Sequence, residues 1–367
     1  MPHLFSELRL RDVMLLNRIG VSPMCQYSCV DGYANDWHFV HLGARSVGGA
    51  ALVFTEAAAV SPEGRISPED LGVWSEKHFE ALERITRFID AQGAVAGVQL
   101  AHAGRKASVY RPWSGQGAVP EKLGGWTPVG PSALSFGAGY ATPEELSVER
   151  VQTLQRAFAA AAVRAYAAGF RVIEIHAAHG YLLHQFLSPL SNRRADAYGG
   201  SFDNRIRFLC ECVTGVRAAL ADRCPLFVRI STTDWTDGGW DLDQSVELAR
   251  RLKNLGVDVI DCSSGGNVAK AEIPVGPGYH VPFAERIRRE AEIATAAVGM
   301  ITAAAQADQI IRNGQADLVL LARELPREPY WPLHAARELG QPMSWPAQYL
   351  RVAPHGASER MPAHEID

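Results

Sequence analysis

The sequence contains little cysteine and no cysteine pattern typical of a metal site. Only six cysteines occur in 367 residues, which suits a reducing compartment better than a disulfide framework. Cys25 and Cys29 are spaced C-x3-C, and Cys210 and Cys212 are spaced C-x-C, with no CxxC pair and no histidine cluster at zinc-finger spacing. We therefore expect neither a disulfide scaffold nor a structural metal site.

Long apolar runs and an excess of one charge are also missing. The longest stretch without a charged residue, 123–143, is rich in Gly, Pro and Ser, which argues against a membrane span. The N-terminus carries Glu7 and Arg9 and has no apolar run typical of a signal peptide. The 36 basic and 40 acidic residues give a net charge of −4, without the basic excess of a general nucleic-acid binder. These absences predict a cytoplasmic protein with no membrane or nucleic-acid partner.

What the sequence does contain is a repeated alternation of short apolar segments and helical patterns. The apolar segments are rich in Val, Ile and Leu, as in parallel strands that are covered on both faces. We expect strands at 19–23, 51–55, 95–100, 172–176, 226–231, 257–262, 298–302 and 317–321. We expect helices at 37–47, 77–91, 148–168, 203–220, 243–255, 281–291, 303–313 and 330–339.

Eight strands alternating with eight helices predict an α/β fold, a (β/α)8 TIM barrel. A doubly wound open sheet is the main competitor, but no G-x-G-x-x-G motif follows the first strand. Residues 3–17 alternate enough to form an N-terminal β-hairpin, and the Gly- and Pro-rich segment 104–147 is expected to be a long loop after strand 3. We expect one domain over 1–367, with the barrel at about 18–340 and a C-terminal extension at 341–367.

Polar residues gather at the predicted carboxyl ends of the strands, where barrel enzymes place their catalytic groups. These residues are Ser22–Tyr27 after the first strand, Gln99, His176 with His179 and Tyr181, Arg229, and Ala322–Arg323. Each has a plain structural alternative: Gln99 could satisfy loop backbone, the histidines could be core residues or a metal pair, and Arg229 could pair with Glu174. Cys25 alone could be a packed small residue, and Tyr181 alone an interfacial aromatic. Their joint position at one end of the barrel favours a functional site.

The chemistry of this set narrows the kind of ligand. No pair of carboxylates typical of glycosidases occurs at this rim, and no G-x-S-x-G nucleophile motif is present. The loops after the last two strands, near Gly299 and Arg323, are where barrels frequently bind phosphate. A phosphate there, beside a polar pocket, suits a phosphorylated cofactor such as FMN.

Four motifs together resemble the old yellow enzyme family. They are SPMCQY (22–27), QLAHAGRKA (99–107), EIHAAHGYLLHQFLSPLSNRRADAYGGSFDNRIRF (174–208) and LARELPREPYW (321–331). The cysteine in the first motif resembles the thermophilic-like, xenobiotic-reductase-type subclass. The resemblance implies an FMN-dependent ene-reductase that takes hydride from NADPH or NADH and reduces activated C=C bonds of small electrophilic alkenes.

The resemblance also implies a role for each matching residue. Residues lining the flavin would be Ser22, Pro23, Met24, Cys25, Ala57, Gln99 and Arg229, and those near its phosphate would be Gly299, Ala322 and Arg323. His176 and His179 would bind the substrate oxygen, Tyr181 would supply a proton, and Tyr27 would contact the substrate. Cys25 would tune the flavin potential. Arg351 resembles the arginine that such homodimers, or dimers of dimers, extend into the neighbouring subunit's site.

Alanines replace glycines that relatives usually carry, at Ala303–Ala305 and at Ala322. Alanine lacks access to positive φ and adds a methyl group, so we expect weaker FMN retention than is usual for the family. Two other functions remain as alternatives: a dienoyl-CoA-type reductase, for which the sequence has no clustered cysteine motif, and a flavin-free barrel acting as a metal-dependent lyase or binding protein.

Overall fold

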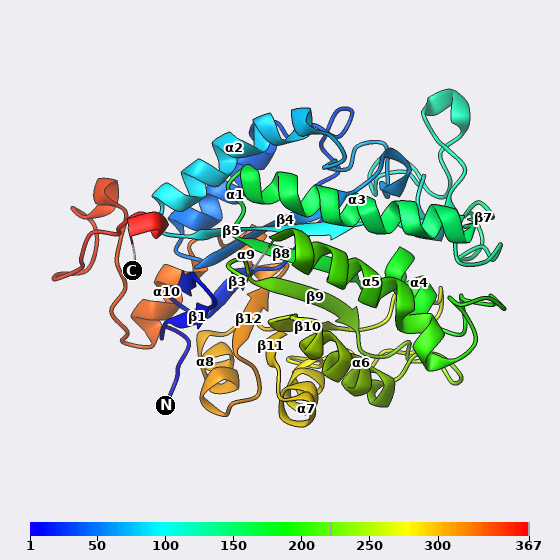
Figure 1. The fold of residues 1–367 in the computed structure, drawn as a ribbon. Helices are drawn as coiled ribbons and strands as arrows, with labels where there is room; N and C mark the ends of the chain where they lie inside the picture. Colours follow the sequence, from blue (N-terminus) through cyan, green and yellow to red (C-terminus); the bar gives the residue numbers. More distant parts are fainter. Residues whose placement is uncertain (221, 366–367) are drawn as a thin grey trace.

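The computed structural model describes residues 1–220 and 222–365 and contains the expected parallel barrel (Figure 1). The barrel strands are hydrogen-bonded in the closed order β10-β11-β12-β3-β4-β5-β8-β9. Their bounds are β3 (Ile19–Val21), β4 (Leu52–Ala59), β5 (Val95–Ala101), β8 (Val172–Ala177), β9 (Leu226–Ser231), β10 (Val259–Ser263), β11 (Ala294–Ala297) and β12 (Leu318–Leu321). The predicted (β/α)8 fold is confirmed.

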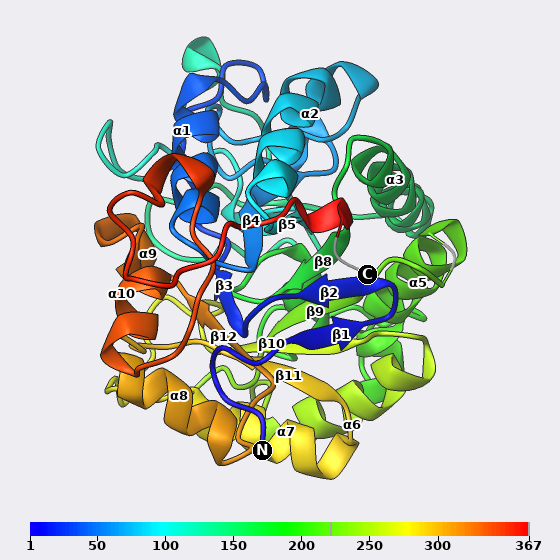
Figure 2. The same cartoon turned by 90° about the vertical axis from the view of Figure 1, so that its left-hand side faces the viewer.

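Helices surround the barrel on all sides (Figure 2). The long ones are α1 (Asp36–Val47), α2 (Glu76–Ala91), α3 (Val148–Ala167), α5 (Phe202–Leu220), α6 (Leu242–Asn254), α7 (Val281–Ala291), α8 (Ala304–Arg312) and α10 (Trp331–Glu338), each overlapping a predicted helix. Helix α3 illustrates why the pattern succeeds: Val151, Leu154 and Phe158 recur on its buried face, and the side chain of Ser147 accepts the Arg150 N–H. Short helices α4 (Leu182–Leu187) and α9 (Glu324–Arg327) add to these.

The expected hairpin closes the amino-terminal end of the barrel. Strands β1 (Leu8–Leu10) and β2 (Val13–Leu15) pair antiparallel and cross this end in Figure 2. Leu10, Val13 and Leu15 are buried in one apolar cluster with barrel residues that include Leu52 and Phe227. This cluster seals the barrel interior from below.

The predicted seventh strand, 298–302, is wrong. The strand is β11 at Ala294–Ala297, four residues earlier, paired with both β10 and β12. Its sequence, ATAA, has three alanines, which have low β-propensity, whereas the more apolar run that follows contains Gly299 with φ +114° and Met300 with φ 50°. These two left-handed residues cannot continue a strand, so the apolar run is the loop after β11.

The remaining segments lie at opposite ends of the barrel in Figure 1. The long loop after β5, the third strand of the barrel, contains β6 (Val129–Gly130) and β7 (Glu144–Glu145) near the carboxyl ends of the strands, as expected for a rim loop. The C-terminal segment after α10 lies at the other end, beside the hairpin. The 3-10 turns are η1 (Pro62–Gly64), η2 (Gly104–Lys106), η3 (Glu121–Leu123), η4 (Ala347–Tyr349) and η5 (Ala363–Glu365).

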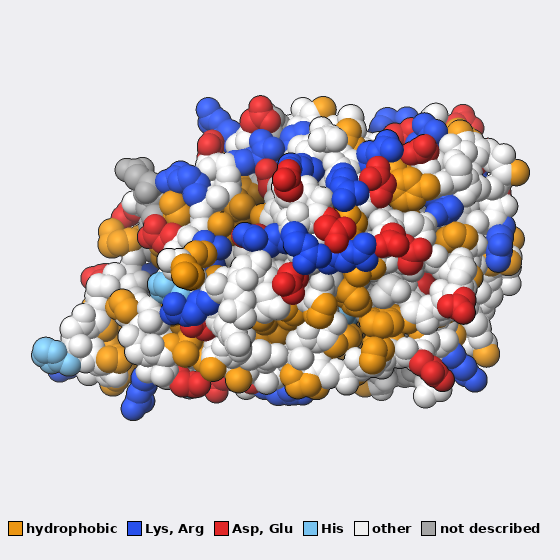
Figure 3. Space-filling model, turned by 90° about the horizontal axis from the view of Figure 1, so that it is seen from below, with side chains coloured by type: hydrophobic (Ala, Val, Ile, Leu, Met, Phe, Trp, Pro, Cys, Tyr) orange, Lys and Arg blue, Asp and Glu red, His pale blue; other side chains and the backbone are white. Residues whose placement is uncertain are grey.

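The surface carries mixed charges over α6, α7 and α8, the side shown in Figure 3. Arg251 pairs with Glu247 within α6, and Arg286 of α7 pairs with Asp243 of α6. Basic and acidic side chains therefore alternate on this face. Within residues 1–220 and 222–365, every helix is too short or too polar to cross a bilayer.

Candidate active site

Strand register brings four of the predicted residues together. Ala57 lies opposite Gln99, Gln99 opposite Glu174, and His176 opposite Arg229. These positions are near the carboxyl ends of β4, β5, β8 and β9, and all of these residues are buried. A register shift in β4 between Phe54 and Ala57 brings Ala57 level with Gln99.

Arg229 is the centre of a buried charge cluster. Its Nε lies 3.1 Å from Asp261 Oδ2, while Gln99 Nε2 donates a hydrogen bond of 2.7 Å to Glu174 Oε1. The ion-pair partner of Arg229 is thus Asp261 on β10, and not Glu174 as the structural alternative supposed. Burial raises the pKa of Glu174 to about 8, which favours its protonated form at neutral pH. Arg229 and Asp261 then form the charged pair, with the guanidinium lining a cavity.

His176, His179 and Tyr181 form one cluster of rings. The His176 ring lies 5.1 Å from the His179 ring and 5.1 Å from the Tyr181 ring, centroid to centroid. Burial and the charge of Arg229 hold the pKa of both histidines well below its usual range, so both are neutral at neutral pH. Burial raises the pKa of Tyr181, so its phenol keeps its proton. The cluster therefore offers neutral hydrogen-bond donors and a phenolic proton.

Cys25 and Tyr27 follow β3 and face this cluster. They pack with Tyr181 against Ile66, Ala103 and Ala107. Burial raises the pKa of the Cys25 thiol well above its usual value, which keeps it protonated and argues against a nucleophilic thiolate. Tyr27 has φ 50°, an uncommon backbone conformation for a tyrosine and one often found at functional sites.

A second buried cluster supports this segment and was not anticipated from the sequence. His38 Nε2 lies 3.0 Å from Glu56 Oε1 and 3.3 Å from Cys29 Sγ. Glu56 Oε2 accepts the backbone N–H of Gln26, the residue between Cys25 and Tyr27. Three metal-ligand types thus meet, with their ligand atoms within 4.8 Å of one another. Their mutual contacts account for their burial and tie α1 and β4 to the segment that carries Cys25.

A cavity of about 280 Å³ extends from Arg229 to Arg323. Gly299 and Ala322 line it, together with Tyr279 and His280, which sequence reasoning missed because they belong to no strand end. Ser22 lies beside Ala322, because its N–H donates to Leu321 O (3.1 Å), and its buried Oγ has no hydrogen-bond partner among the described residues. Pro23 and Met24 continue from Ser22. A cavity lined by two arginines, Arg229 and Arg323, fits a phosphorylated flavin.

The alanine substitutions do not strain the backbone. Ala303 has φ −91°, and none of Ala303, Ala304, Ala305 and Ala322 has a positive φ. The conformational reason that we gave for weak FMN retention is therefore wrong, and only the added methyl groups remain as a reason. Gly299 is the residue of this cavity that needs to be glycine, because a Cβ there would lie 2.9 Å from His280 Nδ1.

Arg351 is the one predicted site residue that the fold keeps apart from the others. It is exposed and belongs to the C-terminal segment at the amino-terminal end of the barrel, the end opposite His176 and Arg229 (Figure 1). Arg351 therefore does not contribute to the site of its own chain.

The chain is similar to curated NADPH dehydrogenases and to a solved reductase structure. The chain is 49% identical over 350 residues to an NADPH dehydrogenase of Geobacillus sp. (strain WCH70), covering 95% of this chain and 98% of that protein. It is 47% identical to an NADPH dehydrogenase of Bacillus subtilis (strain 168), with the same coverage. The structure of morphinone reductase matches with a TM-score of 0.77 and 26% identity, over 93% of this chain and 91% of that one.

A family model identifies the chain. Residues 3–341 match the model of FMN oxidoreductases described as the NADH:flavin oxidoreductase / NADH oxidase family. This match confirms the family that the motifs predicted, with FMN as cofactor, and excludes the flavin-free alternative. The chain therefore belongs to the NADH:flavin oxidoreductase / NADH oxidase family and is an NAD(P)H-dependent flavin oxidoreductase.

Proposed function

We propose that the enzyme reduces activated C=C bonds of α,β-unsaturated carbonyl, maleimide or nitro compounds. The observation that carries this proposal is the cluster of His176, His179 and Tyr181, in which two neutral imidazoles and a protonated phenol meet beside the charged Arg229. Such a set can polarise a substrate oxygen and deliver a proton without any charged acid.

The cofactor is proposed to lie along the cavity, with its phosphate near Gly299, Ala322 and Arg323. Ser22, Pro23, Met24, Cys25, Ala57, Gln99 and Arg229 would contact the rest of the flavin. Bound FMN, reduced by NADPH or NADH, supplies the hydride for the β-carbon of the substrate. The positive charge of Arg229 favours an electron-rich ring beside it, which is the contribution of the protein to this chemistry.

The substrate is proposed to bind with its carbonyl or nitro oxygen at His176 and His179. Hydrogen bonds from both rings stabilise negative charge that develops on this oxygen, and the low polarity of the buried site strengthens them. Tyr181 donates its proton to the α-carbon, and Tyr27 contacts the substrate from the neighbouring loop. The phenol of Tyr181 can act because burial keeps it protonated at neutral pH.

Cys25 is proposed to tune the flavin rather than to react with the substrate. The protonated thiol is uncharged and is a weak hydrogen-bond donor. Cys25→Ala should therefore shift the flavin reduction potential and both half-reaction rates. An unchanged potential together with unchanged rates would show that Cys25 is a packing residue.

Arg351 is proposed to act in the site of a second subunit, in a homodimer or a dimer of dimers in the cytoplasm. Its position at the far end of its own barrel supports this proposal. Arg351→Ala should weaken substrate binding without changing the rate of flavin reduction at saturating NADPH.

The deciding experiment is an anaerobic titration of the reduced enzyme with a panel of enones, maleimides and nitroalkenes. Stoichiometric return of the oxidised flavin spectrum, with formation of the saturated product, is expected. Reoxidation by oxygen or quinones but by no member of the panel would reduce the function to that of a general NADPH dehydrogenase.

A further inference from the structure

The short segment from Ala178 to Tyr181 carries two of the proposed catalytic side chains on an unusual backbone. His179 has φ 57° and Gly180 has φ 71°, so two consecutive residues are left-handed. A Cβ on Gly180 would lie 2.1 Å from Gly266 O, so the loop after β10 packs directly against it. Such a conformation persists only where surrounding contacts hold it.

Four side chains hydrogen-bond to the backbone of His179 and Gly180. The His179 N–H donates to Ser231 Oγ (2.9 Å), and the His179 carbonyl accepts from Lys106 Nζ (2.8 Å). The Gly180 carbonyl accepts from Gln185 Nε2 (2.7 Å). The Gly180 N–H donates to His184 Nδ1 (2.9 Å), a side chain from the first turn of α4. This last contact fixes the peptide bond between His179 and Gly180, which leads to Tyr181.

The tautomer of His184 follows from this contact. Because Nδ1 accepts a hydrogen bond, it carries no proton, and the ring proton is on Nε2. His184 Nε2 lies 3.0 Å from Asp234 Oδ1, and both side chains are fully buried. Neither atom makes a well-aligned hydrogen bond with any described group, so their close contact with each other is what balances their burial. Asp234 thus selects the tautomer that can accept the Gly180 N–H.

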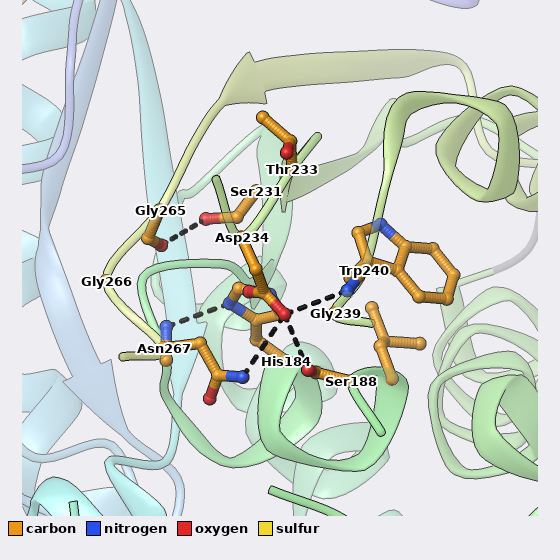
Figure 4. A network of polar contacts seen from close by, with 12 residues as sticks. His184, Ser188, Ser231, Thr233, Asp234, Gly239, Trp240, Gly265, Gly266 and Asn267 are labelled. Carbon is orange, nitrogen blue, oxygen red and sulfur yellow. Dashed lines mark hydrogen bonds and ion pairs between the residues drawn. The ribbon is translucent and has the colours of Figure 1, made fainter. Parts of the chain in front are cut away.

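Asp234 is itself held as an anion by the network in Figure 4. Its Oδ2 accepts hydrogen bonds from Ser188 Oγ (2.5 Å) and from the Trp240 N–H (2.9 Å). Burial alone would raise its pKa, but the imidazole of His184 and these hydrogen bonds lower it to about 2. Asp234 therefore remains ionised wherever the enzyme is folded at ordinary pH.

We propose that His184 and Asp234 are positioning residues of the proposed reaction. Asp234 fixes the His184 tautomer, and His184 Nδ1 fixes Gly180, which holds His179 and Tyr181 in their relative orientation. Neither residue touches the reacting atoms. The inference rests on the proposed function, since it assigns the purpose of this network to the alignment of His179 with Tyr181.

Two isosteric variants of His184 separate alignment from stability. Asparagine places its Oδ1 where Nδ1 lies, so His184→Asn keeps the acceptor for Gly180 and loses the contact with Asp234. Glutamine places its amide where Nε2 lies, so His184→Gln keeps the contact with Asp234 and loses the acceptor for Gly180. Asp234→Asn allows the ring to reverse its tautomer and is expected to resemble His184→Gln. Thr86→Val removes the buried hydrogen bond of Thr86 to Ala168 O and is the control for lost stability alone.

The measurements are the single-turnover rate at which 2-cyclohexenone reoxidises the reduced FMN enzyme, its apparent dissociation constant, and the thermal unfolding midpoint. We expect His184→Gln to lower the rate on the order of 10- to 100-fold with a small loss of thermal stability. We expect His184→Asn to stay within roughly 3-fold of the wild-type rate with the larger loss of thermal stability. Thr86→Val should lower only the midpoint.

Equal losses of rate in His184→Asn and His184→Gln, or a rate that follows the unfolding midpoint across all variants, would overturn the positioning role while the proposed function stands. A wild-type enzyme that no enone, maleimide or nitroalkene reoxidises would instead overturn the proposed function, and this inference with it.

Discussion

The two ends of the barrel interior differ within the length of a few residues. On β9, Phe227 belongs to the apolar cluster under the hairpin, and Arg229, two residues further on the same inward face, belongs to the charge cluster. The same change occurs on β8, from Val172 to Glu174, and on β10, from Val259 to Asp261. The apolar layer is complete by itself, whereas the polar layer holds buried atoms that make no hydrogen bond with any described residue. Among them are His176 Nδ1 and Arg229 Nε, the latter held, within the described part of the chain, only by its ion pair with Asp261.

Along each of these strands, the residues that stabilise the fold are therefore different from the residues that are available for chemistry. Apolar side chains in the apolar layer stabilise the fold by their burial and need no ligand. Buried polar groups in the polar layer destabilise the fold until a ligand forms hydrogen bonds with them. Changes in the apolar layer should therefore affect unfolding and leave the chemistry intact, whereas changes in the polar layer should affect the chemistry first.

The largest expected effect is a loss of reaction rate from a change in the polar layer. Tyr181→Phe removes the proposed proton donor and should slow enone-dependent reoxidation on the order of 100-fold or more, because general acid catalysis typically contributes that much. The free energy of unfolding should stay within about 1 kcal/mol of wild type. Stopped-flow reoxidation and urea unfolding measure the two quantities. Tyr166→Phe, on α3, is the matched control, and an unchanged rate in Tyr181→Phe would mean that another group supplies the proton.

The second largest expected effect is a loss of stability from a change in the apolar layer. Leu15→Ala opens a cavity in the fully buried cluster under the hairpin and should lower the free energy of unfolding by about 2–5 kcal/mol. The reoxidation rate per bound FMN should not change. Leu123→Ala, at a side chain that is 58% exposed, should change neither quantity. A lower rate in folded Leu15→Ala enzyme would show that the two layers are coupled.

A smaller effect is expected on pH dependence. Burial first, and then the charge of Glu56, raise the pKa of Asp70 to about 7. The usual pKa of this group lies near 4, so its contribution to stability is full below that pH and is lost as pH rises to about 7. In the FMN-free wild-type protein, the free energy of unfolding should fall on the order of 1–3 kcal/mol between pH 5 and 8 because of Asp70. Asp70→Asn should not show this fall. Exposed Asp36→Asn is the control, and a parallel pH profile in Asp70→Asn would contradict the prediction.

The smallest effect is expected on FMN affinity. Ala322→Gly removes a methyl group from the cavity lining, and Ala304→Gly removes one from the buried first residue of α8. Neither releases backbone strain, because neither alanine has a positive φ. We expect the FMN dissociation constant, measured by fluorescence, to tighten by only about 2- to 5-fold, less than 1 kcal/mol. Ala305→Gly, at the next and exposed position of α8, should not tighten it. No change in Ala304→Gly or Ala322→Gly would mean that these methyl groups do not hinder binding.

The hydrophobic pattern predicted most of the fold because it follows local periodicity. Strands and helices with Val, Ile and Leu at regular spacing were found where expected, whereas β11 was misplaced because its residues are small and the apolar run beside it is interrupted by Gly299 and Met300. The position of β11 was mispredicted because the hydrophobic pattern carries no information on the backbone dihedral angles of Gly299 and Met300.

The sequence by itself determined the barrel, the hairpin, the rim loop and the family, because these depend on periodicity and on motifs that are continuous along the chain. Only the tertiary structure showed that Arg229 pairs with Asp261, that His38 meets Glu56 and Cys29, and that His184 meets Asp234. It alone placed the C-terminal segment, to which Arg351 belongs, at the end of the barrel opposite the site. Such contacts depend on strand register and on which loops meet at one end of the barrel, and neither is encoded in the spacing of residues along one segment.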